Sequence, residues 1–306
     1  MKRLTLAVAL AAFAATVLAS SATTAPAVGP TQVTAPAAKV ATLPPLPAAV
    51  RNRKRWNIGV KCDAPPFGYI DVRGKNAGFD VEIAKWFARF AFGNASRVSY
   101  TCAPTPAREP LINTNRVDIV IATFTYTADR DTRIDFSRAY YKATGRLLVR
   151  NGGPINRLND IRGRSVSTTS GSIYDRWMKR CFTNTNVIVT DNLTNALLEF
   201  RNGRADAVMW DDTVLVGQAA QDRSLKLTPD LFLALPYGIG MKQGNTAMKR
   251  WVDSRLNIMK NRDLFFTILK NNIPPRDVAA FSKNILRPKQ NFTYNPPGVS
   301  PETTCP

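Results

Sequence analysis

The chain has 306 residues, and its 42 Lys and Arg against 22 Asp and Glu give a formal net charge of +20. It contains no histidine and no CxxC pair, which argues against zinc sites, histidine-based triads and imidazole acid–base chemistry, so no metal and no cofactor are expected. The basic residues are scattered, with a dense run from Arg51 to Arg55. This distribution favours an acidic ligand, an anionic envelope surface or merely a soluble basic surface over a nucleic-acid partner.

Residues 1–21 have the pattern of a secretory signal peptide. Two basic residues precede an apolar stretch from Leu4 to Leu18, and small residues follow. The cleavage region resembles that of a lipoprotein but lacks the lipobox cysteine, so lipid anchoring is not expected. Residues 22–50 consist mainly of Ala, Pro, Thr and Val and are expected to form a disordered tether. These features predict an exported protein that works outside the cytoplasm.

The four cysteines of an exported chain favour disulfides over metal or redox chemistry. Cys62 and Cys102 are expected to pair, because both follow predicted strands of the same lobe of the fold. Cys181 would then pair with Cys305 and staple the tail, residues 275–306, which is rich in Pro and Asn and is expected to be extended.

The first part of the globular region alternates strand and helix. Strands are predicted at Trp56–Lys61, Arg97–Cys102 and Asp118–Ala122. A helix is predicted at Gly78–Phe92, where apolar residues share one face and acidic residues occupy the first turn, and a short one at Arg108–Asn113. This alternation is typical of an α/β fold with a parallel sheet.

A second α/β unit follows the first. Its strands are predicted at Arg146–Val149, Ser165–Thr168, Val187–Val189 and Ala207–Trp210. Its helical segments are predicted at Leu158–Arg164, Tyr174–Cys181 and Leu193–Asn202, and a strand at Tyr237–Met241 and one helix at Thr246–Leu269 come after them. Because ligands of such sheets bind beyond the carboxyl ends of the strands, the polar turns of the two units are expected to face one another across a cleft.

The turn after the strand that ends at Ala122 has the chemistry of an anion site. Thr127 is a suitable helix N-cap, because its hydroxyl would accept a backbone N–H. Arg130 then stands in the first helical turn, where a cation opposes the helix dipole. A guanidinium beside exposed N–H groups and Thr hydroxyls would bind a carboxylate or phosphate, whereas an ordinary surface role would pair Arg130 with Asp129 or Asp135.

The segment Gly78-Phe-Asp-Val-Glu-Ile-Ala84 resembles the signature of the family 3 extracellular solute-binding proteins, the polar amino-acid receptors of ABC importers. The resemblance extends from Trp56 to Asn272 and includes the Thr-x-Thr…Arg turn, the Ser-Gly-Ser turn at 170–172 and the strand-terminal Asp211. It implies an α/β fold of the two-lobed type II periplasmic-binding-protein class, with a ligand cleft between the lobes.

The resemblance also implies how the chain is divided. Residues 51–149 and 236–274 would form lobe 1, and residues 150–235 would form lobe 2. The lobes would close about crossings near Arg150 and Pro236 in a hinge motion.

Within the family the chain is most similar to the aspartate/glutamate-binding branch, which implies roles for the residues at the amino-acid end of a ligand. Arg130 would hold the α-carboxylate, helped by Thr125 and the turn at Ser172. The backbone of Thr123 and the carboxylate of Asp211 would hold the α-ammonium.

Three further residues would lie at the side-chain end of the ligand. Lys61 ends the first strand, where histidine- and glutamine-binding relatives typically carry Asp, and Arg108 matches the arginine that reads a distal carboxylate. Tyr237 is carried over as a hydroxyl donor near the same group. Two cations there imply L-glutamate or L-aspartate, since a neutral amide would leave them unmatched.

Other roles are open to several of these residues. Lys61 at a strand end would otherwise face solvent, and Arg108 would otherwise pair with Glu109 or Asp118. Asp212, next along the chain, is an alternative to its neighbour as the binding carboxylate. Four tryptophans are expected to pack within the lobes rather than against the ligand: Trp86, Trp177, Trp210 and Trp251.

The resemblance implies a monomeric substrate-binding protein of an amino-acid ABC importer, which docks on a membrane permease when closed. One alternative is a receptor module that a membrane sensor protein reads. Another is an enzyme similar to the cyclohexadienyl dehydratases that share this fold, with Asp212 as general acid. The completeness of the amino-acid cradle favours binding over catalysis.

Overall fold

The computed structural model describes residues 43–275, 277–292 and 301–306. The expected signal peptide and most of the expected tether therefore lie outside the described residues. The last three residues of the expected tether belong to the folded part of the chain, because helix α1 (Ala48–Arg53) begins there and its Val50 is fully buried. No helix within the described ranges is long and apolar enough to cross a membrane.

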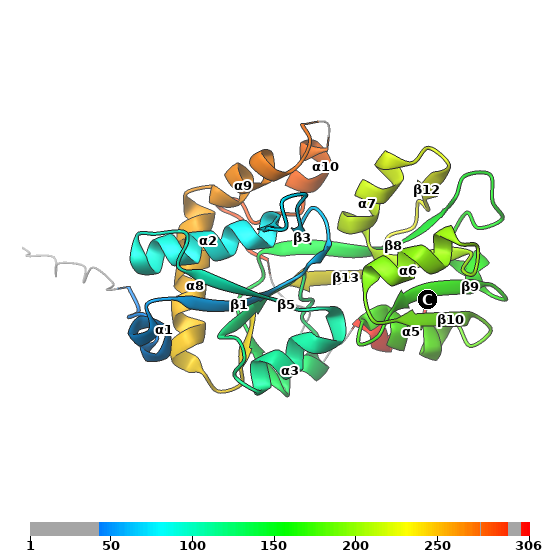
Figure 1. The fold of residues 1–306 in the computed structure, drawn as a ribbon. Helices are drawn as coiled ribbons and strands as arrows, with labels where there is room; N and C mark the ends of the chain where they lie inside the picture. Colours follow the sequence, from blue (N-terminus) through cyan, green and yellow to red (C-terminus); the bar gives the residue numbers. More distant parts are fainter. Residues whose placement is uncertain (1–42, 276, 293–300) are drawn as a thin grey trace, which may run out of the picture. The chain divides into compact units, whose positions relative to one another are not determined.

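The first sheet has the strand order β5-β1-β6-β14-β7. Its parallel strands are β1 (Trp56–Val60), β5 (Val98–Cys102) and β6 (Ile119–Ile121). Strand β14 (Gly240–Lys242) runs antiparallel to β6 and to β7 (Ile134–Phe136). The predicted alternation of strand and helix is thus confirmed (Figure 1). Strand β14 shows that the chain returns to this sheet after forming the second one.

Helices pack on this sheet as the apolar patterns predict. Helix α2 (Phe79–Phe92) ends at Gly93, which adopts the left-handed conformation, and α3 covers Arg108–Asn113 as expected. The single helix predicted at Thr246–Leu269 is two, α8 (Thr246–Asn261) and α9 (Leu264–Asn272). The break follows from Asp263, whose φ of 53° cannot continue a right-handed helix.

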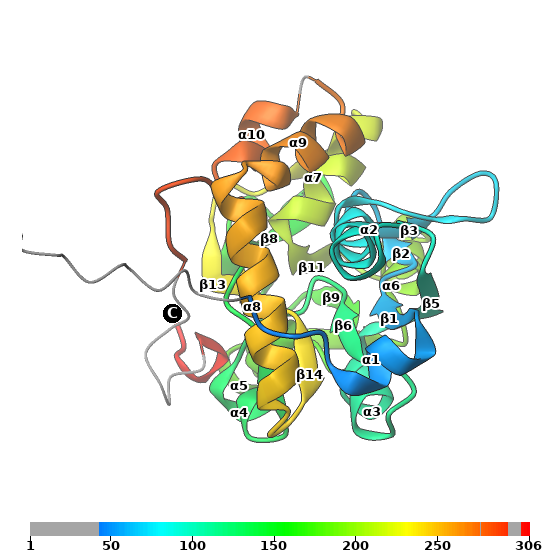
Figure 2. The same cartoon turned by 90° about the vertical axis from the view of Figure 1, so that its left-hand side faces the viewer.

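Aromatic side chains join these helices to the sheet. Trp251 of α8 packs on Trp56 of β1 at 5.1 Å and on Phe87 of α2 at 5.4 Å between ring centroids. Figure 2 shows α8 as the long helix in front of the first lobe. Burial of these large rings is the main favourable term for the packing of this layer.

A small sheet extends from the end of β1. It consists of β2 (Asp63–Ala64), β3 (Gly68–Ile70) and β4 (Asn76–Ala77) in antiparallel order. It carries the chain from β1 to α2.

The second sheet has the strand order β10-β9-β11-β8-β12, with β13 also paired to β8. Its strands are β8 (Tyr141–Arg150), β9 (Ser165–Thr169), β10 (Asn186–Thr190), β11 (Ala207–Asp211), β12 (Leu225–Leu227) and β13 (Phe232–Tyr237). Its helices are the short η2 (Leu158–Ile161), α5 (Ile173–Cys181), α6 (Leu193–Arg201) and α7 (Asp212–Gln221). Two lobes of α/β structure, each with its own sheet, confirm the expected fold class.

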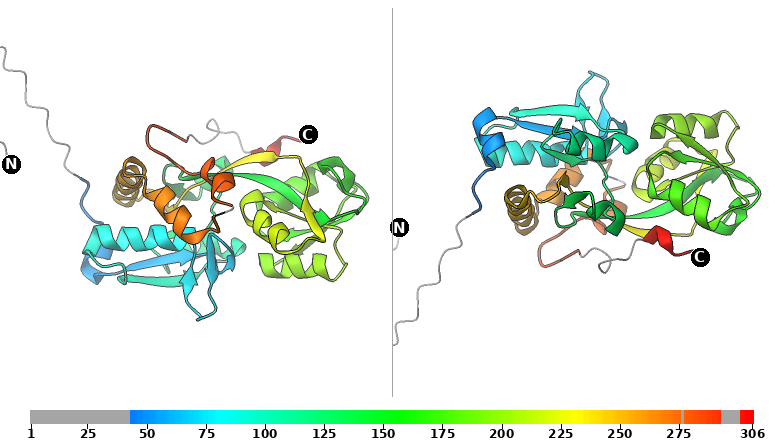
Figure 3. Two further views of the ribbon diagram at one scale, coloured as in Figure 1. Left: turned by 90° about the horizontal axis from the view of Figure 1, so that it is seen from above. Right: turned by 90° about the horizontal axis from the view of Figure 1, so that it is seen from below.

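The lobe boundary at 149/150 was wrong. The whole of β8 belongs to the second sheet, so the chain leaves lobe 1 before Tyr141 rather than near Arg150. The return crossing follows Tyr237, next to the expected position at Pro236. Figure 3 shows β8 and β13 as the neighbouring strands that lead into lobe 2, and Tyr141 pairs with Tyr237 at their base.

The tail is more ordered than expected. Helix α10 (Val278–Ser282) buries Phe281, and Ile285 is fully buried after it. The short η3 (Pro301–Thr303) is followed by Cys305, which forms the expected disulfide with Cys181 of α5. The apolar residues of this segment explain the difference, because they cover surface of the core that an extended tail would leave exposed.

Candidate functional site

The expected ligand residues meet at a cavity to which both lobes contribute. It is lined by Arg108, Thr123, Thr125, Arg130, Ser172, Ile173, Tyr174, Trp210 and Asp211. Six of these were expected, whereas Lys61 and Tyr237 are not among the lining residues. The cavity is small, with a volume of about 10 Å³, which is enough for a single water molecule. An amino acid therefore enters only when the lobes or the lining side chains move.

The turn after β6 has the local structure that its threonines predict. The hydroxyl of Thr127 accepts a hydrogen bond from the backbone N–H of Arg130 at 3.1 Å, which confirms the N-cap of α4 (Ala128–Asp131). Thr123 has a positive φ of 43°. This bend turns the chain from the end of β6 toward the cavity, so that Thr123 and Thr125 both line it.

Arg130 is buried and spans the cleft. It donates from Nη1 to the carbonyl of Thr125 at 2.7 Å and from Nη2 to the carbonyl of Gly171 in lobe 2 at 2.8 Å. Its Nε has no hydrogen-bond partner among the described residues, and the nearest carboxylate oxygen, on Glu109, is 3.5 Å away. Burial and the nearby Arg108 lower the pKa of Arg130 to about 9. A buried cation with unused donors is suited to an anionic ligand group.

The surface pairings considered for Arg130 do not occur. Asp129 pairs with Arg133 at 2.9 Å, and Asp135 accepts the backbone N–H of Gly244 at 3.0 Å. Gly171 was not expected to take part. Its φ of +69° favours glycine, and a Cβ there would make a tight contact of 3.3 Å with Cα of Pro106 in lobe 1.

Arg108 is held at the cavity wall by backbone carbonyls. It donates to Thr105 at 3.2 Å, Ala122 at 3.2 Å and Thr123 at 3.1 Å, and its guanidinium lies 4.4 Å from the ring centre of Phe124. Burial lowers its pKa to about 10. No carboxylate of the described ranges forms an ion pair with it, so a second buried cation borders the cavity without a neutralising partner.

The alternative partners of Arg108 are engaged elsewhere. Glu109 pairs with Arg133 at 2.8 Å, and Asp118 pairs with Arg53. Arg108 therefore lines the cavity without either of these partners.

Asp211 supplies the negative charge of the cavity. Its carboxylate accepts hydrogen bonds from the hydroxyls of Tyr174 and Tyr237. Burial, opposed by these two bonds, raises its pKa to about 6. Asp212 is not an equivalent candidate, because its Oδ1 accepts the backbone N–H groups of Thr144 at 3.1 Å and Thr213 at 2.8 Å.

Tyr237 lies behind Asp211 and is not among the lining residues. Its hydroxyl donates a hydrogen bond to the Asp211 carboxylate and lies 3.2 Å from the hydroxyl of Thr213. Tyr174 and Trp210 were not predicted in the site. Both flank expected site residues, since Tyr174 follows the Ser172 turn by two positions and Trp210 precedes Asp211. Their closeness in sequence to expected site residues is the signal from which both could have been predicted.

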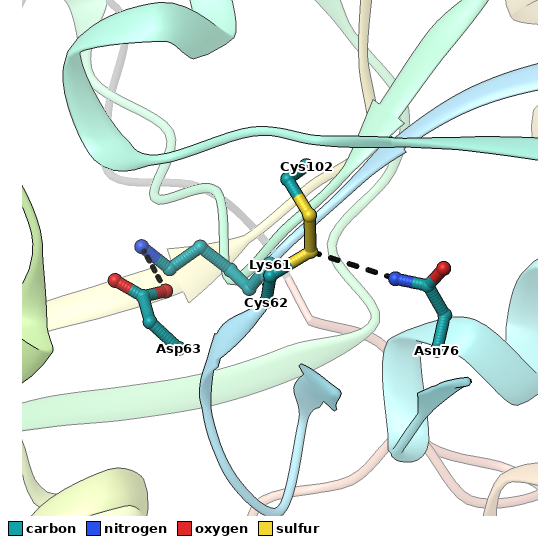
Figure 4. Close-up of a disulfide and its surroundings, with 5 residues drawn as sticks. All are labelled: Lys61, Cys62, Asp63, Asn76 and Cys102. Atoms are coloured by element: carbon teal, nitrogen blue, oxygen red, sulfur yellow. Dashed lines mark hydrogen bonds and ion pairs between the residues drawn. A yellow bond between two sulfur atoms is a disulfide. The ribbon is translucent and has the colours of Figure 1, made fainter. Parts of the chain in front are cut away.

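Lys61, which we expected to face the side chain of the ligand, pairs with Asp63. Its side chain is fully buried, and its Nζ lies 2.9 Å from Oδ1 of Asp63 (Figure 4). The same Nζ lies 3.3 Å from the hydroxyl of Thr105. Burial is the main cause that lowers its pKa. Gly68 allows this packing, because a Cβ there would lie 2.6 Å from the carbonyl oxygen of Lys61. The neighbouring disulfide Cys62–Cys102 is formed as expected.

Asp80 supports the site from behind. It is fully buried at the start of α2, and its carboxylate accepts the backbone N–H of Thr123 and the hydroxyl of Tyr140, both at 2.8 Å. Burial raises its pKa to about 7. The carboxylate thus connects the bent cavity turn to the residue that precedes β8. The motif around Asp80 does not by itself indicate these contacts with Thr123 and Tyr140.

Comparisons with known proteins agree with this geometry. The family model for bacterial extracellular solute-binding proteins, family 3, matches residues 56–272. The ABC transporter glutamine-binding protein GlnH of Bacillus subtilis is 28% identical over 225 residues, which are 73% of this chain and 82% of the relative. The L-glutamate/L-aspartate-binding protein of Pseudomonas aeruginosa is 28% identical over 240 residues, 72% of this chain and 78% of the relative.

Solved structures show the same architecture. A solute receptor for L-cysteine from Neisseria gonorrhoeae superimposes with a TM-score of 0.73 at 26% sequence identity, covering 75% of this chain and 94% of that one. The relatives differ in the amino acid that their names give, so similarity alone does not select the ligand.

Proposed function

This chain belongs to the family 3 bacterial extracellular solute-binding proteins, and on that premise we propose that it binds an acidic amino acid, L-glutamate or L-aspartate, outside the cytoplasm. Closure of its lobes around the ligand would prepare it to dock on the membrane permease of an ABC importer. Its function is binding rather than catalysis. The names of the relatives support the importer role, and the charges around the cavity support the ligand class.

The amino-acid end of the ligand would be bound by groups from both lobes. Arg130 offers guanidinium N–H groups to the α-carboxylate, with Thr125 and Ser172 beside it at the cavity wall. Asp211 offers a carboxylate to the α-ammonium, and its tyrosine partners hold it in place. Both ligand charges would then be paired within the buried site, as burial of ions requires.

The side-chain end is the part on which the acidic assignment depends. The observation that carries it is the buried guanidinium of Arg108, which is hydrogen-bonded to carbonyls and paired with no carboxylate of the described residues. Arg108, Arg130 and Asp211 sum to a charge of +1 at the cavity wall, and a dicarboxylic amino acid carries −1, so the filled site would be neutral. A glutamine ligand would leave one guanidinium unmatched, which costs affinity.

The Lys61–Asp63 pair changes the expected charge balance. With Lys61 neutralised by Asp63, one cation instead of two faces the ligand side chain, and the filled cleft has no excess charge. The acidic assignment therefore needs only Arg108.

Calorimetric titration of the purified protein with L-glutamate, L-aspartate, L-glutamine and L-arginine tests the proposal. We expect binding heat with the two acidic ligands, and at least about a thirtyfold loss of affinity in Arg130→Ala, since a buried charged partner is removed. Arg133→Ala is the matched control, because Arg133 is exposed and pairs with Glu109 and Asp129. Absence of binding to every amino acid, or equal effects of the two variants, would overturn the proposal.

A further inference from the structure

We propose that Asp63 is a latch between the lobes, in which one carboxylate oxygen holds Lys61 of lobe 1 and the other holds the first N–H of helix α6 in lobe 2. Oδ1 lies 2.9 Å from Nζ of Lys61, and Oδ2 accepts the backbone N–H of Leu193 at 3.0 Å. The proposal goes beyond the proposed function, on which it depends only for the identity of the ligand.

The latch residue is presented by a rigid part of lobe 1. Asp63 opens β2 directly after Cys62, whose disulfide with Cys102 ties the loop to the end of β5 (Figure 4). The same loop accepts a weak hydrogen bond from Asn76 to the sulfur of Cys62 at 3.5 Å. Asp63 is therefore fixed relative to the first sheet, and its side chain keeps 13% of its exposure.

The partner in lobe 2 has a matching need. The first N–H groups of a helix have no partner within the helix, and a carboxylate near them is favourable. In α6 the side chain of Asn192 caps the N–H of Asn195 at 2.9 Å, and the N–H of Leu193 is the one that Asp63 satisfies. Helix α6 is thus capped partly by its own lobe and partly by the other.

The latch stands between two open grooves. A groove of about 370 Å³ is lined by Asp63, Tyr69 and Leu197, among others, and one of about 330 Å³ by Asp63, Pro104 and Asn195, among others. Both also involve Thr194. Because space flanks the contact on both sides, the Asp63–Leu193 bond is a point at which the lobes touch rather than part of a continuous packed interface.

This arrangement explains why the ammonium group of Lys61 pairs with Asp63, although its Nζ lies only 6.0 Å from the ring centre of Trp210 in the cavity lining. Its charge offsets that of Asp63 inside lobe 1, so the carboxylate can approach α6 without leaving a buried ion unpaired. Lys61 then acts on the ligand site through the closed state and not through a ligand contact. Asp63 is a positioning residue, since it is not among the residues that line the cavity.

The test measures closure without ligand, so it does not depend on which amino acid binds. Dyes attached through non-canonical residues at the exposed positions Val72 of lobe 1 and Leu231 of lobe 2 would report the ratio of closed to open molecules by single-molecule energy transfer. We expect Asp63→Ala to lower this ratio about tenfold, the effect of one charge-assisted hydrogen bond. Lys61→Met should lower the ratio less than Asp63→Ala does, because the carboxylate loses its charged partner but the bond to α6 remains.

Two further variants separate the latch from general damage. Lys61→Met/Asp63→Ala removes both charges and avoids an unpaired buried lysine, and it should open as Asp63→Ala does. Asn192→Ala weakens the cap within α6 and should leave the ratio unchanged. An unchanged ratio in both Asp63 variants, or an equal shift in Asn192→Ala, would overturn the latch. If the Asp63 variants shift toward the open state but the unmodified protein binds no amino acid, the latch stands and only the proposed function is refuted.

Discussion

The affinity of the cleft for its ligand is expected to weaken as the pH falls below about 6. Burial raises the pKa of Asp211 to about 6 in the ligand-free protein, so the carboxylate is largely ionised at pH 7 and largely protonated at pH 5. The ligand ammonium needs the ionised form, and its binding would lower this pKa. Affinity then scales with the ionised fraction of Asp211, which falls about tenfold between pH 7 and pH 5.

Trp210 makes this dependence measurable by fluorescence. Its ring lies at the cavity wall next to Asp211, so a titration with L-glutamate at several pH values yields a dissociation constant at each. Asp211→Asn should bind at least about thirtyfold more weakly at pH 7, because the ammonium loses its charged partner, and its residual affinity should not change around pH 6. Asp212→Asn is the control and should retain the pH dependence of the unmodified protein. Equal affinities at pH 5 and 7, or a pH dependence that survives in Asp211→Asn, would refute the reasoning.

Two further predictions concern stability. Asp80 has a folded-state pKa of about 7, above its unfolded value, so the stability it contributes is present below about pH 4 and is lost as the pH rises through 7. The melting temperature of Asp80→Asn should therefore fall less between pH 5 and pH 8 than that of the unmodified protein, and identical slopes would contradict this. Cys181 and Cys305 are 124 residues apart, so replacing both with serine should lower the free energy of unfolding by up to about 5 kcal/mol. Cys62 and Cys102 are 40 residues apart, and the same replacement there should lower it by up to about 4 kcal/mol. Urea unfolding measures both losses, and an unchanged midpoint in either variant would contradict the prediction.

Features that depend on neighbouring residues in the sequence were predictable. Helix α3 covers Arg108–Asn113, and Thr127 caps α4 through its own hydroxyl, because both depend on residues within one turn. The ordered motifs between Trp56 and Asn272 also identified the fold class. From them we expected Arg108, Arg130 and Asp211 to lie near one another, and all three line one cavity.

Features that depend on distant residues were not predictable in the same way. Strand β8 is longer than its apolar segment, because its first residues pair with β13 from Tyr141 onward. The late strand was expected at Tyr237–Met241, but the chain changes sheets there, so β13 ends at Tyr237 and β14 begins at Gly240. Periodicity alone does not reveal such a change of sheet.

The partners of the site residues show the same limit. Asp63 lies two positions from Lys61, yet its pairing depends on the bend that β2 makes after Cys62. Tyr237 meets Asp211 across 26 residues, and the hydroxyl that we expected near the ligand side chain donates a hydrogen bond to this carboxylate. The sequence gives the charge of each site residue and the order of these residues along the chain. Which charged side chains neutralise one another becomes known only from the three-dimensional structure.

Arg108 should select a ligand with a side-chain carboxylate. The ratio of the dissociation constants for L-glutamine and L-glutamate, determined by calorimetry in the unmodified protein and in Arg108→Met, measures this selection. We expect the unmodified protein to prefer glutamate by at least about tenfold, and the ratio to fall toward one in Arg108→Met because the unmatched charge is gone. Tighter binding of glutamine by the unmodified protein, or a preference for glutamate that Arg108→Met leaves unchanged, would contradict it.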